Sequence, residues 1–285
     1  MELLFKLKRK NLNGLTMANF EEKDLIDNRR YPLHSPASSS YLNLVSQCQQ
    51  DLNRNGACML PGFLTTEATA QIVAEIDRIA PKAYPCNEVH NVFLEEDDIS
   101  FPEDHPRRLK EKTSLGSLAY DHIEKDDALR TLYEWDSLLH FVAAVLGKEK
   151  MYRMADPMAA LTVNVMRKDQ NHGWHFDESL VTTTVILQKP LEGGEFQYVT
   201  DLRGEDWNNY ESLNDVLSGN ENRIQTLPVE AGTLLLFAGY YQLHRVTPVV
   251  GNTTRYVATL CFKDEPGVCN SPEVQKLFYG RTAAV

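Results

Sequence analysis

Apolar residues recur at helical spacing through the first half of the chain. In Tyr41–Arg54 they lie three or four positions apart, and Gly56 follows as a residue suited to end a helix. The same pattern defines two further segments, 65–79 and Asp126–Leu146. Amphipathic helices of this kind normally pack onto a sheet. Residues 31–148 are therefore predicted to be a mostly helical support.

From residue 149 onward, runs of β-branched and apolar residues alternate with glycine-containing turns, a pattern typical of strands. Five segments carry it: Tyr152–Met158, Ala160–Met166, Leu180–Gln188, Gly193–Val199 and Glu230–Phe237. The fold class is therefore predicted to be mainly β with flanking helices. We expect one domain over residues 31–285, with the helical support at 31–148 and the β core at 149–285.

Three segments stand outside this pattern. Residues 1–30 are predicted to be a flexible extension, because termini are usually poorly ordered unless they are tied down. Asn87–Arg108 is irregular and polar, which favours a solvated loop over the alternative of a lid. Asp201–Asn222 is a polar insertion, and we expect it to form a partly folded cover because it contains three larger side chains: Trp207, Tyr210 and Leu213.

Charge and cysteine content limit the partners of the chain. The formal net charge of −11 argues against nucleic acid and against an anionic membrane surface as partners. Five cysteines without a Cys-x-x-Cys pair favour free thiols in a reducing compartment. No run approaches the roughly 20 apolar residues of a membrane span. We therefore expect a cytoplasmic protein.

The candidate chemistry centres on His175-Phe176-Asp177. If this stretch is a strand, the imidazole and the carboxylate point to one face and Phe176 to the other. Two histidines and one carboxylate form the facial triad that holds non-haem Fe(II) and leaves the opposite coordination positions open. A short His-x-Asp motif is weak by itself. The best candidate for the third ligand is the distant His244.

The order of motifs makes the signal specific. Five features follow one another: His-x-Asp at 175–177, Gly-Gly-Glu-Phe at 193–196, Pro-x-x-Ala-Gly-Thr-Leu-Leu-Leu-Phe at 228–237, His-Arg-Val-Thr-Pro at 244–248, and Arg255. This order resembles the core of Fe(II)/2-oxoglutarate-dependent dioxygenases. Within that superfamily it is similar to the branch of carrier-independent amino-acid halogenases and their hydroxylase relatives. The resemblance covers about residues 125–281.

This resemblance implies a fold, cofactors and roles. The fold would be a double-stranded β-helix, a cupin-like jelly-roll with the metal near one mouth. His175, Asp177 and His244 would hold Fe(II), and 2-oxoglutarate and O2 would be the cosubstrates. Arg255 would pair with the far carboxylate of 2-oxoglutarate, because a guanidinium binds a carboxylate through two hydrogen bonds and stays charged when buried. Arg281 is the alternative anchor.

The resemblance also bears on reaction and substrate. Halogenases of this branch carry a small residue, typically glycine, at the position of Asp177, and chloride binds there. Because this chain has the carboxylate, hydroxylation is predicted. His172 and Glu178 lie where amino-acid enzymes of the branch place substrate contacts, and Trp174 is a candidate pocket wall. The expected partner is a small polar metabolite, a free amino acid or a derivative.

A different class of protein uses similar ligands. Cupin-like barrels bind metals through histidines and a carboxylate, and they can act as sensors without 2-oxoglutarate. Arg255 discriminates between the two, because a barrel without a dicarboxylate has little use for a buried arginine on an apolar strand. A zinc hydrolase would need a general base, and none is identified.

Overall fold

The described part of the chain begins before the predicted domain boundary. The computed structural model describes residues 21–283, so the first 20 residues of the predicted extension lie outside the described residues. After the short 3-10 helix η1 (Glu22–Asp24), Leu25 and Ile26 are buried, and Ile26 forms a β-bridge with Leu64. Residues 25 and 26 therefore pack on the core, and the boundary predicted at residue 30 lies too far along the chain.

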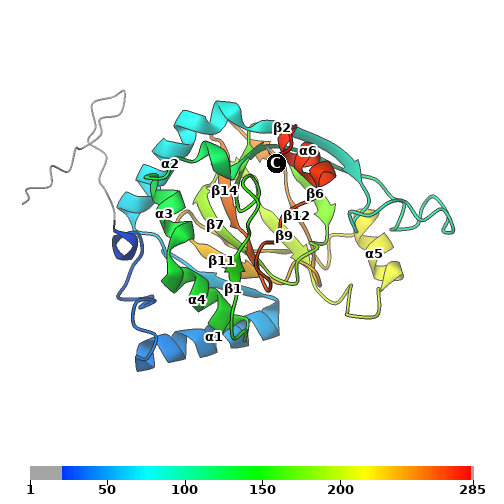
Figure 1. The fold of residues 1–285 in the computed structure, drawn as a ribbon. Coiled ribbons are helices and arrows are strands. Elements are labelled where there is room, and N and C mark those ends of the chain that lie inside the picture. The colour runs from blue at the N-terminus through cyan, green and yellow to red at the C-terminus, as the bar shows by residue number, and fades with distance from the viewer. Residues whose placement is uncertain (1–20, 284–285) are drawn as a thin grey trace, which may run out of the picture.

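Four helices cover one face of the largest sheet (Figure 1). They are α1 (Ser39–Asn55), α2 (Thr66–Ile79), α3 (Ala128–Glu134) and α4 (Asp136–Val145). The first two are bounded by local signals: Ser38 and Thr65 accept hydrogen bonds from backbone N–H groups in the first turns, and Gly56 ends α1 in a left-handed conformation. Among the helices of residues 21–283, none combines the length and apolar character needed to cross a lipid bilayer.

The largest sheet has seven strands, and every pair in it is antiparallel. In spatial order the strands are β1 (Ala57–Leu60), β11 (Leu234–Phe237), β7 (Thr182–Gln188), β14 (Arg255–Leu260), β5 (Leu161–Met166), β3 (Glu111–Leu118) and β2 (Tyr84–His90). Residues of the central strands alternate between the two faces, and one face packs against the helices. On β14, Tyr256, Ala258 and Leu260 belong to that helix-side core.

A smaller sheet faces the other side of the large one. Its strands are β10 (Gln225–Thr226), β9 (Phe196–Val199), β12 (Leu243–Val246) and β6 (His172–His175). Tyr198 of β9 packs in one cluster with Ile186 and Val257 of the large sheet, and Val246 packs with Met166. The two sheets therefore enclose a common interior, as predicted for a double-stranded β-helix.

The remaining elements lie outside the two sheets. They are the 3-10 helices η2 (Ala80–Lys82) and η3 (Tyr120–His122), the paired strands β8 (Glu192–Gly193) with β13 (Val249–Val250) and β4 (Tyr152–Arg153) with β15 (Phe262–Lys263), and the helices α5 (Tyr210–Leu217) and α6 (Pro272–Tyr279). Helix α5 lies within the polar insertion and packs beside β6 and β9, on the opposite side of the barrel from α1–α4 (Figure 1). The predicted cover is therefore partly helical.

The single helix predicted over Asp126–Leu146 is wrong, because the structure has two helices there. Trp135 adopts an extended backbone conformation between α3 and α4. Arg153 donates hydrogen bonds to the backbone carbonyls of Tyr133 and Glu134, at 2.8 and 2.7 Å. In an unbroken helix, backbone N–H groups of the next turn would occupy these carbonyls. A residue 18 positions after Trp135 therefore caps the C-terminal end of α3.

Two further predictions of local structure are wrong in part. The irregular segment beginning at Asn87 continues the edge strand β2, whose residues up to His90 pair with β3. Only Cys86 in this strand is buried, so no hydrophobic period marks it. The strand predicted over Tyr152–Met158 is limited to its first two residues, because Asp156 turns the chain by accepting hydrogen bonds from the backbone of Met158 and Ala159.

Glu75 makes the stability of the helical support depend on pH. Its side chain is 2% exposed and accepts hydrogen bonds from Gln71 and from the backbone N–H of Ala128, at the start of α3. Burial raises the pKa of Glu75 to about 7. A carboxyl group whose pKa is raised on folding contributes stability that is complete below its unfolded pKa and is lost as the pH rises through the folded pKa.

We expect Glu75→Gln to remove this dependence, because glutamine is never charged: its side-chain oxygen can accept from the Ala128 N–H, and its NH2 group can donate to the side-chain oxygen of Gln71 once that amide is turned over. At pH 8 the variant should be more stable than the parent protein by more than about 1 kcal/mol, and at pH 5 by less. Urea unfolding at both pH values measures the difference. Glu67→Gln changes an exposed position of the same helix and should leave the stability at both pH values as in the parent protein. An equal gain in stability at pH 8 from both variants would contradict the role assigned to Glu75.

Candidate functional site

Two histidines and one aspartate meet inside the barrel mouth. One nitrogen or oxygen atom from each of His175, Asp177 and His244 lies within 4.8 Å of the other two. The Asp177 Oδ1 atom is 3.7 Å from His175 Nε2 and 3.5 Å from His244 Nε2. The two histidines are cross-strand partners on β6 and β12. The structure therefore brings together the three side chains that sequence reasoning singled out as ligands.

The histidine rings are oriented by their own backbone. His175 Nδ1 donates to the carbonyl of Gly173 at 2.8 Å, and His244 Nδ1 donates to the carbonyl of Gln242 at 2.9 Å. This arrangement leaves the Nε2 lone pair of each ring free, as a metal ligand requires. Burial, together with the neighbouring His172 and His244 rings, holds the pKa of His175 well below its ordinary value. His175 is therefore neutral near pH 7.

Asp177 lies just beyond the end of β6 and is held from two sides. Its backbone N–H donates to the carbonyl of Gly239, and the Thr182 hydroxyl donates to its Oδ2 atom at 2.6 Å. Burial alone would raise the pKa of Asp177, but the His244 and His175 rings and the Thr182 hydroxyl outweigh burial and lower it. The carboxylate is thus charged, with its Oδ1 atom directed at the histidines.

A β-bulge in β6 changes which side chains face the site. His175 pairs with His244 but His172 pairs with Val246, so β6 contains one extra residue between these pairs. His172 consequently lies on the same face as His175, with the ring centroids 3.9 Å apart. Burial, with His244 nearby, lowers the pKa of His172 to about 3. At Gly173 an added Cβ would lie 2.8 Å from the Lys112 carbonyl, so the bulge leaves no room for a side chain.

Trp174, predicted as a pocket wall, lies away from the three proposed ligands. Trp174 is buried on the opposite face of the small sheet, in a cluster that includes Phe176, and Arg245 lies over its ring at 4.4 Å. This places it against the insertion that carries α5 and away from the three ligands. Glu178 is exposed beyond Asp177, so its predicted role in binding substrate stays a prediction.

Arg255 lies on the interior face of β14 at the opposite end from Leu260. Its side chain is 4% exposed, and its nearest polar partner is the Met166 sulfur at 3.7 Å. Within residues 21–283 it forms no ion pair, and burial lowers its pKa to about 10. Gly194 allows this burial, because an added Cβ there would lie 3.1 Å from Arg255 Cδ. A buried guanidinium without a carboxylate calls for an anionic ligand.

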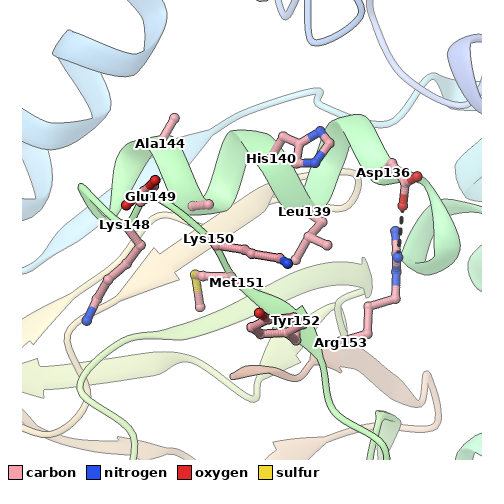
Figure 2. A pocket seen from close by; sticks show the side chains of 11 residues that line it. Asp136, Leu139, His140, Ala144, Lys148, Glu149, Lys150, Met151, Tyr152 and Arg153 are labelled. Carbon is pink, nitrogen blue, oxygen red and sulfur yellow. Dashed lines mark ion pairs between the residues drawn. The ribbon is translucent and has the colours of Figure 1, made fainter. Parts of the chain in front are cut away.

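A separate surface pocket of about 640 Å³ lies between α4 and the segment after it (Figure 2). Two of its basic groups already have acidic partners, since Arg153 pairs with Asp136 and Lys148 with Asp264, both at 3.0 Å. It contains none of the predicted site residues. The barrel interior, with its triad and its unpaired arginine, is therefore the candidate functional site.

Solved structures share this fold. The non-haem α-ketoglutarate-dependent carbocyclase SnoK from nogalamycin biosynthesis is 17% identical, with 86% of this chain and 95% of SnoK covered and a TM-score of 0.55. A prolyl hydroxylase from Trichoplax adhaerens, in complex with a hypoxia inducible factor peptide, is 15% identical, with 81% and 96% covered and a TM-score of 0.52. HygX from Streptomyces hygroscopicus, with nickel, 2-oxoglutarate and hygromycin B bound, is 15% identical, with 76% and 86% covered and a TM-score of 0.51. Comparison with curated proteins finds no match.

The chain shares the double-stranded β-helix of these structures, and its His-Asp-His triad is a ligand set suited to non-haem Fe(II). The model of the halogenase D family matches residues 41–273, and this chain belongs to that family. The match includes the helical support as well as the β core. It confirms the superfamily and the halogenase-related branch that the motifs indicated.

Sequence reasoning missed Gly239, which leaves room for Asp177. An added Cβ at Gly239 would overlap the Asp177 carboxylate. We expect Gly239→Ala to displace this carboxylate and to weaken Fe(II) binding at least about tenfold, as loss of a group supporting a ligand usually does. Anaerobic titration with Fe(II) measures this change in affinity. Gly147→Ala, in open space far from the triad, should lower stability only. Unchanged Fe(II) affinity in Gly239→Ala would argue against Asp177 as a ligand.

Proposed function

We propose that the chain uses Fe(II), 2-oxoglutarate and oxygen to hydroxylate an unactivated C–H bond of a small polar metabolite, a free amino acid or a derivative. The observation that carries the proposal is the buried, unpaired guanidinium of Arg255 in the same interior as the triad. The triad suits Fe(II), and the arginine suits the second carboxylate of a dicarboxylic acid.

The residues present fit the metal. His175 and His244 offer Nε2 lone pairs, and Asp177 offers Oδ1 while Thr182 holds its other oxygen. Two neutral imidazoles and one carboxylate leave a bound Fe(II) with a net positive charge, which favours an anionic cosubstrate. When bound, Fe(II) and 2-oxoglutarate together activate oxygen, and 2-oxoglutarate is decarboxylated to succinate.

The residues also fit 2-oxoglutarate. Arg255 projects from β14 into the interior, and its forked guanidinium can bind the far carboxylate through two parallel hydrogen bonds. Arg255 is buried against the apolar Met166, and low exposure to water strengthens such a pair. HygX was solved with 2-oxoglutarate bound, which supports this use of the shared barrel. The alternative, a cupin-like metal sensor, binds no dicarboxylate and so does not explain the buried guanidinium of Arg255.

Hydroxylation is proposed in preference to halogenation, although the family is described as a halogenase family. Asp177 lies at the position where the halogenases of the branch leave room for chloride. Its Oδ1 atom is directed between the two histidine rings, and its Oδ2 atom is fixed by Thr182. A carboxylate held in this way competes with chloride for the same coordination position.

The substrate is proposed to lie over His172 and near Glu178. The His172 ring is stacked on His175, and its low pKa keeps it neutral, so it offers a hydrogen bond and no charge. Glu178 is exposed beside Asp177 and supplies a negative charge at the mouth. Together they favour a polar substrate that carries an ammonium group.

The experiment is to measure succinate formation with Fe(II), 2-oxoglutarate and oxygen against pooled free amino acids and related polar metabolites. We expect substrate-stimulated succinate and a product heavier by one oxygen atom. A chlorinated product in the presence of chloride would replace hydroxylation by halogenation. No succinate from protein shown to contain Fe(II) would favour the metal sensor.

A further inference from the structure

Arg203 forms an unusual set of contacts near the triad. It lies in the polar insertion between β9 and α5, and its guanidinium is 3.7 Å from the centroid of the Tyr240 ring. It is also 5.2 Å from the Phe176 ring and 5.6 Å from the Phe93 ring. The ion pairs formed by residues 21–283 do not include Arg203. Its interactions are therefore stacking and cation–π contacts, for which arginine is better suited than lysine.

Two of these rings lie next to the groups that hold Asp177 in place. Phe176 directly precedes Asp177 in the chain, and Tyr240 directly follows Gly239, whose carbonyl accepts the Asp177 N–H at 3.0 Å. Gly239 also borders the carboxylate itself. Arg203 therefore bridges the two backbone segments whose separation determines where the Asp177 carboxylate lies.

The insertion is docked around this bridge. Leu202, next to Arg203, is buried in one cluster with Phe176 and with Leu213 of α5. Phe93 stacks on Phe176 with centroids 5.5 Å apart, and Phe176 N–H donates to the carbonyl of Val92. The insertion and the loop after β2 therefore converge on Phe176, which lies in the chain between the proposed ligands His175 and Asp177.

We propose that Arg203 is a positioning residue of the metal centre: stacked on Tyr240 and Phe176, it fixes Asp177 and couples docking of the 201–222 insertion to metal binding. The inference rests on the proposed role of Asp177 as a ligand. Coupling between two sites is reciprocal. If docking of the insertion helps metal binding, metal binding must equally strengthen docking of the insertion.

The test uses Co(II) as the probe, because it is stable in air and its visible absorption reports coordination geometry. Titration of the metal-free full chain with Co(II) gives the affinity and the spectrum together. We expect Arg203→Met to weaken Co(II) binding about tenfold, as removal of a group that orients a ligand does, and to change the spectrum. Hydrogen exchange should show that Co(II) protects residues 201–217 in the parent protein and protects them less in the variant.

Arg107→Met is the matched control. The Arg107 guanidinium lies over the Phe93 ring at 4.7 Å and is tied to Tyr210 and Glu95. Arg107 lies in the loop after β2, and its loss removes an arginine stacked on the same group of aromatic rings without removing a contact of Tyr240 or Phe176. We expect Arg107→Met to lower the melting temperature but to keep the Co(II) affinity and spectrum of the parent protein.

The outcomes separate this inference from the proposed function. Asp177→Ala is titrated alongside, and if it binds Co(II) as the parent protein does, the ligand set and the inference both fail. If Asp177→Ala binds weakly while Arg203→Met keeps the parent affinity, spectrum and exchange protection, only the inference is overturned. Equal loss of affinity in Arg203→Met and Arg107→Met would also overturn it, because general loosening of the cover would then explain both.

Discussion

Replacing Asp177 with alanine is expected to abolish hydroxylation and to weaken Fe(II) binding more than about a hundredfold. Loss of a group that only supports a ligand already costs 10- to 100-fold in metal affinity or activity, and Asp177 is proposed as a ligand itself. The substitution also leaves His175 and His244 without the negative charge that lies 3.7 and 3.5 Å from their Nε2 atoms. Two neutral imidazoles alone form a poor site for Fe(II).

Anaerobic Fe(II) titration and succinate formation measure the two effects separately. Asp206→Ala, at an exposed acidic position of the insertion, is the control and should change neither. Thr182→Val removes the hydrogen bond to Asp177 Oδ2 and keeps the ligand, so its loss of affinity should be smaller than that of Asp177→Ala. Full coupled turnover by Asp177→Ala would remove this carboxylate from the ligand set.

Elements bounded by their own residues could be predicted closely from the sequence. Helix α1 ends at Gly56 and α2 begins after Thr65, because a left-handed glycine and a capping hydroxyl act within one turn. Elements that depend on distant residues could not be predicted. Arg153 caps the end of α3 at Trp135 through two backbone carbonyls, and β2 is an edge strand paired with β3.

The candidate site shows the same division. The triad was predicted from the spacing of His175 and Asp177 and from the order of the later motifs. In the structure the two histidines are cross-strand neighbours on β6 and β12. Simple alternation would place His172 on the face opposite His175, but the bulge in β6 brings the two rings to the same face. Gly239 was missed because it differs from other glycines only through the carboxylate that the fold brings against it.

Replacing Arg255 with methionine is expected to change two measurements in opposite directions. Methionine fills similar volume among Met166 and the apolar residues around it without carrying a buried charge. Burial already lowers the pKa of Arg255 to about 10, so the unpaired cation costs the folded chain free energy. Without 2-oxoglutarate, the variant should therefore have a higher melting temperature than the parent protein.

With 2-oxoglutarate the order should reverse. The cosubstrate should raise the melting temperature of the parent protein and leave that of Arg255→Met nearly unchanged. The apparent KM for 2-oxoglutarate should rise more than about tenfold, the value of a lost hydrogen-bonded charge pair. Arg281→Met is the control: Arg281 is paired with Asp121 at 2.6 Å and is partly exposed. If Arg281→Met raised this KM and Arg255→Met did not, Arg281 would be the anchor, and the buried cation of β14 would need another anion.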